Sequence, residues 1–529
     1  MQRVFNIQQL FWVDNATISL IEQKELTKSL RTELQGIRDE LKNANSFATG
    51  HVCIFDEEGF NPTSSDQFYE VMKEISTNCT DKMKHFAGKV IEKSVELLTP
   101  KPPCGFAAVA IGSIARGEAT PYSDLEYLFL IERKDPETIN YFVNLAVTTY
   151  FLMGNLGETK LSYIAIKELD KWFDDKAKNG FKIDGLTKDA GNIPTGNGTS
   201  KKYNQFILTP EELASAYKYE LDNPDPEESL RGDLTAMLAY TQEIYQRGGG
   251  TLLDLFKSMI KDYDHNPSRN EANLKMLQHD ARKFDFLPND RLFSSGFGTH
   301  VKKELYRFPS ILLLDTCLVE GCIRDSSWDS LEELAQCGTI SNDVANRLKF
   351  LLASATYIRL SAYLFHDSHD DRMSVGKQLD SSRVEGDEKN TAARKWFITG
   401  SLFTHVCGVM IPLKQYLMSD EFKTKGMTKE ELKEDYGWSN VVTLYFTGRF
   451  KQALTQLVKM IPQICENPIP EAEAKCISMS KEGVKHILQI ISGILYHCSK
   501  YKAALLLCEH MTSSGISDER VRMATCLVR

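Results

Sequence analysis

The sequence predicts an α+β protein in which a small mixed sheet is followed by one or more helical domains. Two short apolar segments, residues 106–111 and 126–131, are rich in β-forming residues and are separated by turn-forming residues. Longer segments on both sides have apolar residues at helical spacing. The chain has 529 residues, which is too long for one ordinary hydrophobic core, so we expect about two to four domains.

The composition is that of a folded soluble protein, with 42% hydrophobic and 26% charged residues. The net charge of -9 argues against a broad nucleic-acid-binding surface, which is normally basic. No segment approaches the roughly 18 uninterrupted apolar residues that a membrane span needs, and residues 1–15 lack the pattern of a secretory signal. The 12 cysteines include no C-x-x-C pair, which favours reduced thiols. We therefore expect a cytoplasmic protein with neither a membrane nor a nucleic acid as a partner.

The N-terminal part of the chain, residues 1–66, is predicted to be a helical or coiled-coil region. Residues 17–41 have apolar positions near helical spacing and many opposite charges, so they predict an amphipathic helix and a candidate surface for protein partners. A polar interval follows. A second helical segment, residues 67–98, ends at the helix-breaking sequence PKPP, residues 100–103.

The next part, residues 67–210, is predicted to contain the sheet and the helices that flank it. The first apolar strand ends at Gly112, and the second follows after a short turn region. A third, short strand is expected at residues 181–183, directly before Asp184. A loop rich in glycine, proline and asparagine comes next, at residues 191–198.

The rest of the chain is predicted to be mainly helical. A helical domain is expected at residues 211–366, with a marked helix at 233–246. Residues 367–390 are polar and charged, which is typical of a flexible linker. The last part, residues 391–529, contains two similar segments that resemble degenerate tetratricopeptide-type helical hairpins, with a plain helical bundle as the alternative. The two segments are residues 443–454 and 491–505.

One run of residues, from Gly112 to Glu126, has the pattern of a chemical site. The Gly-Ser turn at Gly112 and Ser113, between a strand and a helix start, allows backbone N–H groups to approach phosphate oxygens closely. Asp124 and Glu126 stand two residues apart at the head of a strand, where alternation places both side chains on one face. Two neighbouring carboxylates repel each other unless a dication lies between them, and Mg²⁺ prefers such oxygen ligands.

This run resembles the active-site motif of the polymerase-β-like nucleotidyltransferases, in which Gly-Ser precedes D-x-D or D-x-E by about a dozen residues. The longer pattern G-x-x-x-R-G-E-x-x-P-x-S-D is similar to the N-terminal domain of protein-PII uridylyltransferases and to the related signal-transduction nucleotidyltransferases. Residues 229–233 resemble the helical R-G-D segment of those proteins. Residues 302–309, with the run to Arg359, resemble their C-terminal helical domain. The resemblance covers roughly residues 80–365.

The resemblance implies a set of metal ligands that are also the catalytic residues. Asp124 and Glu126 would hold Mg²⁺, with Mn²⁺ as the alternative ion, and a third carboxylate normally lies on a later strand. Asp184 is our candidate for that third residue, and Asp189 is the alternative. The uridylyltransferases usually have aspartate at the position of Glu126, so the metal geometry would shift by about one methylene.

The resemblance also implies contacts with the nucleotide. Gly112 and Ser113 would hold its phosphates. Arg116 would contact a phosphate, or would instead form a structural ion pair with Glu118.

The function that the resemblance implies is Mg²⁺-dependent transfer of a nucleoside monophosphate from a nucleoside triphosphate to an acceptor, for which we expect a protein. The helical flanks would bind that acceptor or other protein partners. Two alternatives stay open. One is a catalytically inactive scaffold or sensor that keeps the fold and recruits partners through its helices. The other is synthesis of a small nucleotide signal or of a nucleic-acid tail.

The cluster of histidine and aspartate at residues 366–371 is similar to the motif of histidine-aspartate metal hydrolases. That kind of site takes its ligands from several helices, whereas this cluster is local and lies in a polar segment. We therefore interpret the cluster as part of the solvated linker.

Overall fold

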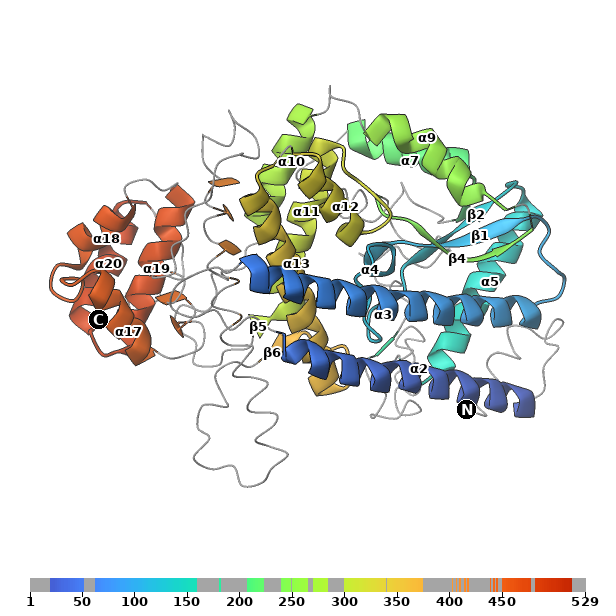
Figure 1. The fold of residues 1–529 in the computed structure, drawn as a ribbon, viewed down its shortest axis with the longest axis horizontal. Coiled ribbons are helices and arrows are strands. Elements are labelled where there is room, and N and C mark those ends of the chain that lie inside the picture. The colour runs from blue at the N-terminus through green and yellow to red at the C-terminus, as the bar shows by residue number, and fades with distance from the viewer. Residues whose placement is uncertain are drawn as a thin grey trace.

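The computed structural model describes most of the chain. The described residues are 20–51, 62–158, 180–181, 207–222, 239–248, 250–264, 270–283, 299–338, 340–373, single positions between 402 and 445, 450–476 and 481–515. Figure 1 shows a small sheet with its helices at one end of the molecule and the C-terminal helices at the other. None of the helices in the described ranges combines the length and the apolarity that a membrane span requires.

Two long helices, α2 (Leu20–Thr49) and α3 (Pro62–Leu97), lie side by side (Figure 1). Their apolar residues recur every three or four positions, so each helix has one apolar face. On α2 this face includes Leu30, Leu34 and Leu41, all buried. The helices predicted from residues 17–41 and 67–98 are thus present, and the first of them continues eight residues further, to Thr49.

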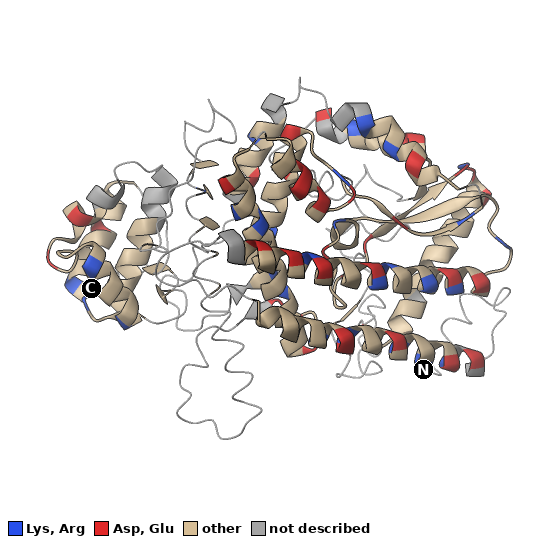
Figure 2. Ribbon diagram, in the orientation of Figure 1, with Lys and Arg blue, Asp and Glu red and all other residues tan. Residues whose placement is uncertain are grey.

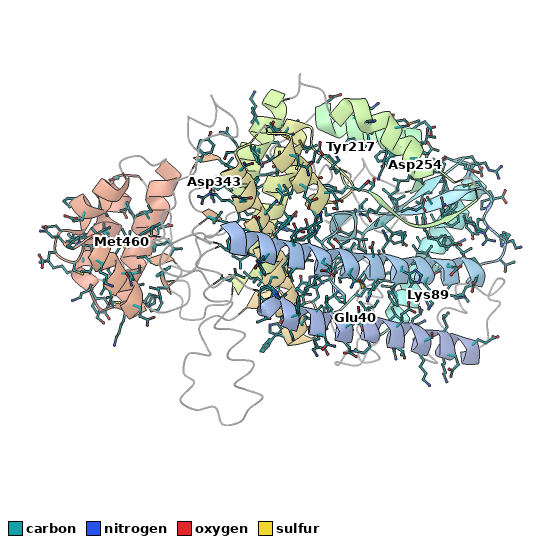
Figure 3. The ribbon with its side chains drawn as sticks, in the orientation of Figure 1. Glu40, Lys89, Tyr217, Asp254, Asp343 and Met460 are labelled. Carbon is teal, nitrogen blue, oxygen red and sulfur yellow. The ribbon has the colours of Figure 1, made fainter. Side chains whose placement is uncertain are left out.

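Charged residues line the exposed sides of both helices, as Figure 2 shows. Ion pairs cross the seam between the helices: Lys82 pairs with Glu40, and Lys89 pairs with Glu33 at 2.5 Å. Figure 3 shows Glu40 and Lys89 at this seam. These pairs are partly exposed, so each stabilises the helix pair by no more than about 1 kcal/mol. The buried apolar faces contribute most of the packing energy.

The sheet has four strands in the order β3-β2-β1-β4: β1 (Phe106–Ala110), β2 (Tyr127–Ile131), β3 (Ile207–Leu208) and β4 (Gln242–Arg247). The central strand β1 is antiparallel to both neighbours, β2 and β4, and β2 is parallel to β3. The first two strands follow the sequence prediction to within one residue. A small mixed sheet among many helices agrees with the predicted α+β class.

Helices cover both faces of the sheet. On one face, alternate residues such as Phe106 and Phe129 pack in the main core, which includes α3 and the helix α5 (Pro136–Asn155). On the other face, Val109 and Leu128 pack against α7 (Pro210–Asp222) and α9 (Leu252–Asp264). Strand alternation therefore produces two separate apolar layers.

The strand β4 corrects one prediction and bears on another. We predicted a helix over residues 233–246, but residues 242–247 form an edge strand against β1. The strand β4 and the helices α7 and α9, which pack on the sheet, lie largely beyond residue 210, where we ended the sheet-containing domain, and that division into domains stays a prediction. The sequence QEIYQR has no strong preference of its own. The open edge of β1 offers backbone partners, and this tertiary context decides the conformation.

The helical part that follows is built around α13 (Asn342–His366), which is buried on most of its surface and packs on α3. Its neighbours are the π-helix η3 (Val301–Tyr306), α11 (Arg307–Glu320) and α12 (Ser327–Gln336). The helix α10 (Asn270–Lys283) packs on α11. Two short strands, β5 (Thr299–His300) and β6 (Arg372–Met373), pair in antiparallel fashion next to η3 and the end of α13.

The C-terminal helices are α17 (Phe450–Met460), α18 (Pro468–Cys476), α19 (Lys481–His497) and α20 (Tyr501–Ser513). The helices α19 and α20 pack as a hairpin across a short turn. The helical character predicted for this part is confirmed for its described residues, and the assignment to tetratricopeptide repeats stays a prediction.

Candidate functional site

The turn after β1 is fixed by the sheet. The Ile111 N–H donates to the Glu126 carbonyl (3.0 Å), which continues the pairing of β1 with β2 by one residue. Gly112 then has a φ of +68°, a left-handed conformation that glycine adopts without strain, and begins the short helix α4 (Gly112–Ala115). A Cβ at Gly112 would overlap the Glu126 carboxylate. The carboxylate of Glu126 therefore lies directly beside the Gly-Ser turn.

The two acidic side chains at the head of β2 lie on the same side of the chain. Leu125, between them, is fully buried in the main core. Successive residues of an extended segment point to opposite faces, so Asp124 and Glu126 point away from that core. Both side chains stay partly exposed, with Asp124 at 10%. The two carboxylates therefore share one side of the chain, where each side chain keeps some solvent exposure.

Two basic side chains from the helical part of the chain reach Asp124. The Lys302 ammonium, from η3, lies 3.7 Å from one carboxylate oxygen, and the His369 Nδ1 lies 3.3 Å from the other. Burial by itself lowers the pKa of His369, but its hydrogen bonds with Asp124 and Asp371 outweigh burial and raise that pKa. A raised pKa favours the charged imidazolium. We call Lys302 and His369 the counter-ion pair of Asp124.

A chain of polar contacts holds His369 from behind. Its Nε2 lies 3.5 Å from Asp371, whose other oxygen accepts a hydrogen bond from the Tyr363 hydroxyl (2.5 Å). Arg359 donates to that hydroxyl (3.2 Å) and to the Ser123 hydroxyl (3.3 Å). Burial raises the pKa of Asp371, but the hydrogen bonds with His369 and Tyr363 outweigh it and lower that pKa below its usual range. The network ties the end of α13 to the residue preceding Asp124.

Arg116 lies in an ion pair with Glu118, a fully buried carboxylate, at 3.3 Å. The hydroxyls of Tyr306 and Ser310 also donate to Glu118, the latter at 3.2 Å. Burial lowers the pKa of Arg116, but the neighbouring Tyr306 and Glu118 outweigh burial and raise it. Of the two options for Arg116, the ion pair with Glu118 is therefore present, and a contact with phosphate stays a prediction.

The turn at Gly117, which follows Arg116, is held from two sides. Ser76 of α3 and the Trp328 indole of α12 each donate to the Gly117 carbonyl at 2.9 Å. The Ser327 N–H donates to the Arg116 carbonyl at 3.0 Å. The loop between the Gly-Ser turn and Asp124 thus depends on helices that are distant in the sequence.

The residues just before Asp124 are held by α2. Arg38 forms a buried bidentate ion pair with Glu158 (2.7 and 2.9 Å) and donates to the Pro121 carbonyl (3.2 Å). Its guanidinium also lies 4.4 Å from the ring centroid of Tyr122. The Tyr122 hydroxyl donates to Asp367 at 2.8 Å. The N-terminal helix and the segment after α13 therefore meet at this turn.

Sequence reasoning missed the counter-ion pair. We interpreted residues 367–371 as solvated linker, and this is wrong, because His369 is only 8% exposed and contacts Asp124. The local density of histidine and aspartate was the available signal, but the sequence does not reveal which distant residue they meet. Lys302 lies in a segment whose resemblance we noted without assigning it a role.

Several predicted site residues fall outside the described ranges. These are Asp184, its alternative Asp189, the loop at 191–198 and the segment 229–233. The third metal ligand therefore stays a prediction.

The described acidic residues fit a metal that arrives with its substrate. Among the described residues, no three histidine, cysteine, aspartate or glutamate side chains group closely enough to hold a metal ion by themselves. Mg²⁺, however, is usually held by one or two carboxylates together with substrate phosphates. Asp124 and Glu126 offer such hard oxygen ligands on one side of the chain, beside a turn that can approach phosphate.

Comparison with known families bears on this geometry. Residues 67–157 match the family described as "Putative nucleotidyltransferase DUF294". The match is consistent with a domain of the nucleotidyltransferase superfamily in this segment of the chain. The matched nucleotidyltransferase segment runs through α3, β1, α4, β2 and α5, so it includes the Gly-Ser turn and both carboxylates, while the counter-ion pair lies outside it. The match supports nucleotidyl transfer in general, with a nucleoside triphosphate as substrate. No curated protein matches the chain.

Proposed function

We propose that this protein catalyses Mg²⁺-dependent transfer of a nucleoside monophosphate from a nucleoside triphosphate to a protein acceptor, in the manner of protein-PII uridylyltransferases. One observation carries the proposal: the Glu126 carboxylate lies against Gly112, with Asp124 on the same side of the chain. The proposed metal ligands and the turn proposed to bind phosphate are thereby adjacent. Nucleotidyl transfer needs this adjacency, since the metal must contact the phosphates that the turn holds.

The reaction requires one bond to form and one to break. An acceptor hydroxyl oxygen attacks the α-phosphorus, the bond from that phosphorus to the bridging oxygen breaks, and pyrophosphate leaves. Bound Mg²⁺ supplies charge neutralisation at the phosphates. Asp124 and Glu126 would hold that ion and so orient the reactants, and the N–H groups of Gly112 and Ser113 would donate to phosphate oxygens. Asp184 would complete the carboxylate set and accept the proton of the acceptor hydroxyl.

The proposal of a protein acceptor rests on charge and on the helical flanks. The net charge of -9 disfavours a nucleic-acid acceptor. The long helix pair α2–α3 and the C-terminal helices offer extended surfaces on which a protein could bind. We propose a cytoplasmic location, in keeping with the scattered cysteines.

The experiment is incubation with each α-labelled ribonucleoside triphosphate, Mg²⁺ and a cell extract depleted of nucleotides, comparing wild type with Asp124→Asn. Asparagine keeps the size of the side chain and removes its charge. We expect a labelled protein band and pyrophosphate release with wild type, and a loss of at least about 100-fold in the variant. Lys134→Met is the control, because its Nζ pairs with Glu212 (2.9 Å) at the opposite end of β2. Equal labelling by wild type and Asp124→Asn would remove Asp124 from its role.

A catalytically inactive scaffold is the second candidate, and one observation favours it. Both carboxylate oxygens of Asp124 already face cationic groups, Lys302 and His369, which would compete with a metal. Thermal stabilisation by nucleotide and Mg²⁺, without pyrophosphate release from any triphosphate, would support this candidate over the enzyme.

A further inference from the structure

We infer that Lys302 and His369 are exchangeable counter-ions, which hold the Asp124 carboxylate before substrate binds and pass to the triphosphate when metal and nucleotide arrive. The inference rests on the proposed function, because it concerns the same site. It assigns to the helical part of the chain, outside the matched family segment, a direct role in binding the phosphates.

The distances support an exchange rather than a permanent bond. Lys302 lies 3.7 Å from Asp124, which is an ion-pair distance and longer than a normal hydrogen bond, and the His369 contact is 3.3 Å. The Lys302 side chain is 28% exposed, so its ammonium can turn toward a ligand in solvent. A flexible lysine suits such a movement better than a planar, bidentate arginine.

The neighbouring arginines cannot take this role as easily. Arg116 pairs with the buried Glu118, and Arg359 lies 4.3 Å from the ring centroid of Tyr306 and donates to Tyr363. Each guanidinium is therefore fixed by fully or almost fully buried partners. Within the described part of the chain, Lys302 and His369 are the basic residues that lie within ion-pair distance of the Asp124 carboxylate.

The two counter-ions are connected through the backbone. The strand β5 lies just before Lys302 in the sequence, and its pairing partner β6 lies shortly after His369. Between them, the Val301 N–H donates to the Asp371 carbonyl at 2.7 Å. Asp371 in turn contacts the His369 ring. The paired strands therefore hold Lys302 and His369 together beside Asp124, so both side chains would face the same ligand.

Charge balance gives the direction of the exchange. In the absence of substrate, the counter-ion pair compensates Asp124, which would otherwise be a partly buried, uncompensated carboxylate. A metal bound to Asp124 would take over that compensation and would repel the Lys302 ammonium. A triphosphate carries more negative charge than one Mg²⁺ neutralises, so the released cations gain a new partner.

The exchange predicts that one variant, Lys302→Met, binds metal more tightly and nucleotide analogues more weakly than wild type. Lys302→Met removes a cation that competes with metal, so Mn²⁺ alone, measured by electron paramagnetic resonance, should bind roughly threefold to tenfold more tightly than to wild type. The same variant should bind the α,β-methylene analogues of the four ribonucleoside triphosphates, with Mg²⁺, roughly 10- to 100-fold more weakly by calorimetry. His369→Gln should change both affinities in the same directions, and Lys302→Arg should retain analogue binding.

The matched control is Lys134→Met, whose lysine has nearly the same exposure (29% against 28%) and also pairs with a carboxylate. It should change neither affinity. Circular dichroism melting of each variant separates loss of folding from loss of binding. The inference is overturned if Lys302→Met and Lys134→Met bind Mn²⁺ equally, or if Lys302→Met binds the analogues as wild type does. If wild type binds Mn²⁺ but none of the analogues, the proposed function fails, and the Mn²⁺ comparison still decides whether Lys302 is a counter-ion.

Discussion

Replacing Gly112 by alanine tests the contact on which the site depends. Two costs are expected. Alanine at a φ of +68° is strained by about 1–2 kcal/mol, because the left-handed region disfavours a Cβ. The new Cβ would also overlap the Glu126 carboxylate, which must move, at a cost of about 1–3 kcal/mol typical of overpacking. The total expected loss of unfolding free energy is about 2–5 kcal/mol.

A second glycine in the chain separates the two costs. Gly338 has the same φ of +68°, but a Cβ there would have nothing within 4 Å. Gly338→Ala therefore measures the backbone strain alone, about 1–2 kcal/mol. The difference between the two variants is the cost of displacing Glu126. Urea unfolding followed by far-UV circular dichroism and by tryptophan fluorescence provides the measurement, and coincident transitions would validate the comparison.

A double-mutant cycle identifies the group that is displaced. In a Glu126→Ala background the carboxylate is gone, and the nearest remaining atom to a Cβ at Gly112 would be the Cβ of residue 126 at 3.5 Å, an ordinary contact. The cost of Gly112→Ala should then fall to that of Gly338→Ala. If Gly112→Ala and Gly338→Ala already cost the same in the wild-type background, the carboxylate does not lie over the turn, and the argument for adjacent metal and phosphate binding is refuted.

Two further predictions concern stability away from the carboxylates. Arg38→Met should lower the unfolding free energy by about 3–5 kcal/mol, because it leaves Glu158 buried without its partner. The double variant with Glu158→Gln should lose clearly less unfolding free energy than Arg38→Met alone. An equal loss in the two variants would contradict a buried ion pair. For His497, stacked on Phe450, burial lowers the pKa, so the folded state favours the neutral ring. The unfolded state then binds the proton more readily, and wild type should lose stability relative to His497→Gln as the pH falls below about 6.5, but not above it. Thermal unfolding of both proteins at several pH values from about 5 to 8 checks the sign, and parallel curves would exclude it.

Local sequence patterns were enough to predict α3 and the strands β1 and β2. The apolar residues of α3 recur at helical spacing and the helix ends before the helix-breaking sequence at residues 100–103, whereas β1 and β2 are continuous apolar runs, the first of them followed closely by Gly112. The turn at Gly112 was predictable for a related reason, since glycine at a strand end signals a left-handed or close-packed position. These are features that residues within one segment determine together.

The edge strand β4 was not predictable in this way. Its burial is only partial, and Ile244 and Tyr245 are adjacent apolar residues that break strict alternation at the β-bulge of the β1–β4 pairing. The sequence therefore lacks the period of two that identifies a strand. Its conformation depends on β1, more than 100 residues earlier, whose open edge needs hydrogen-bond partners.

The charged residues around the site also come from segments that are distant in the sequence, so local patterns could not predict them. Composition gives a net charge of -9, which says nothing about the arginines that converge on the turn before Asp124. Arg38 from α2 donates to the Pro121 carbonyl, and Arg359 from α13 donates to the Ser123 hydroxyl. Both helices lie outside residues 67–157, the segment that matches the nucleotidyltransferase family. A fragment restricted to that segment would keep both carboxylates. It would lose Arg38 and Arg359, which hold the turn before Asp124, and the counter-ion pair that compensates Asp124. The residues that position this site therefore range from α2 to β6, and the N-terminal helix takes part in the site in addition to the protein-binding surface that we propose for it.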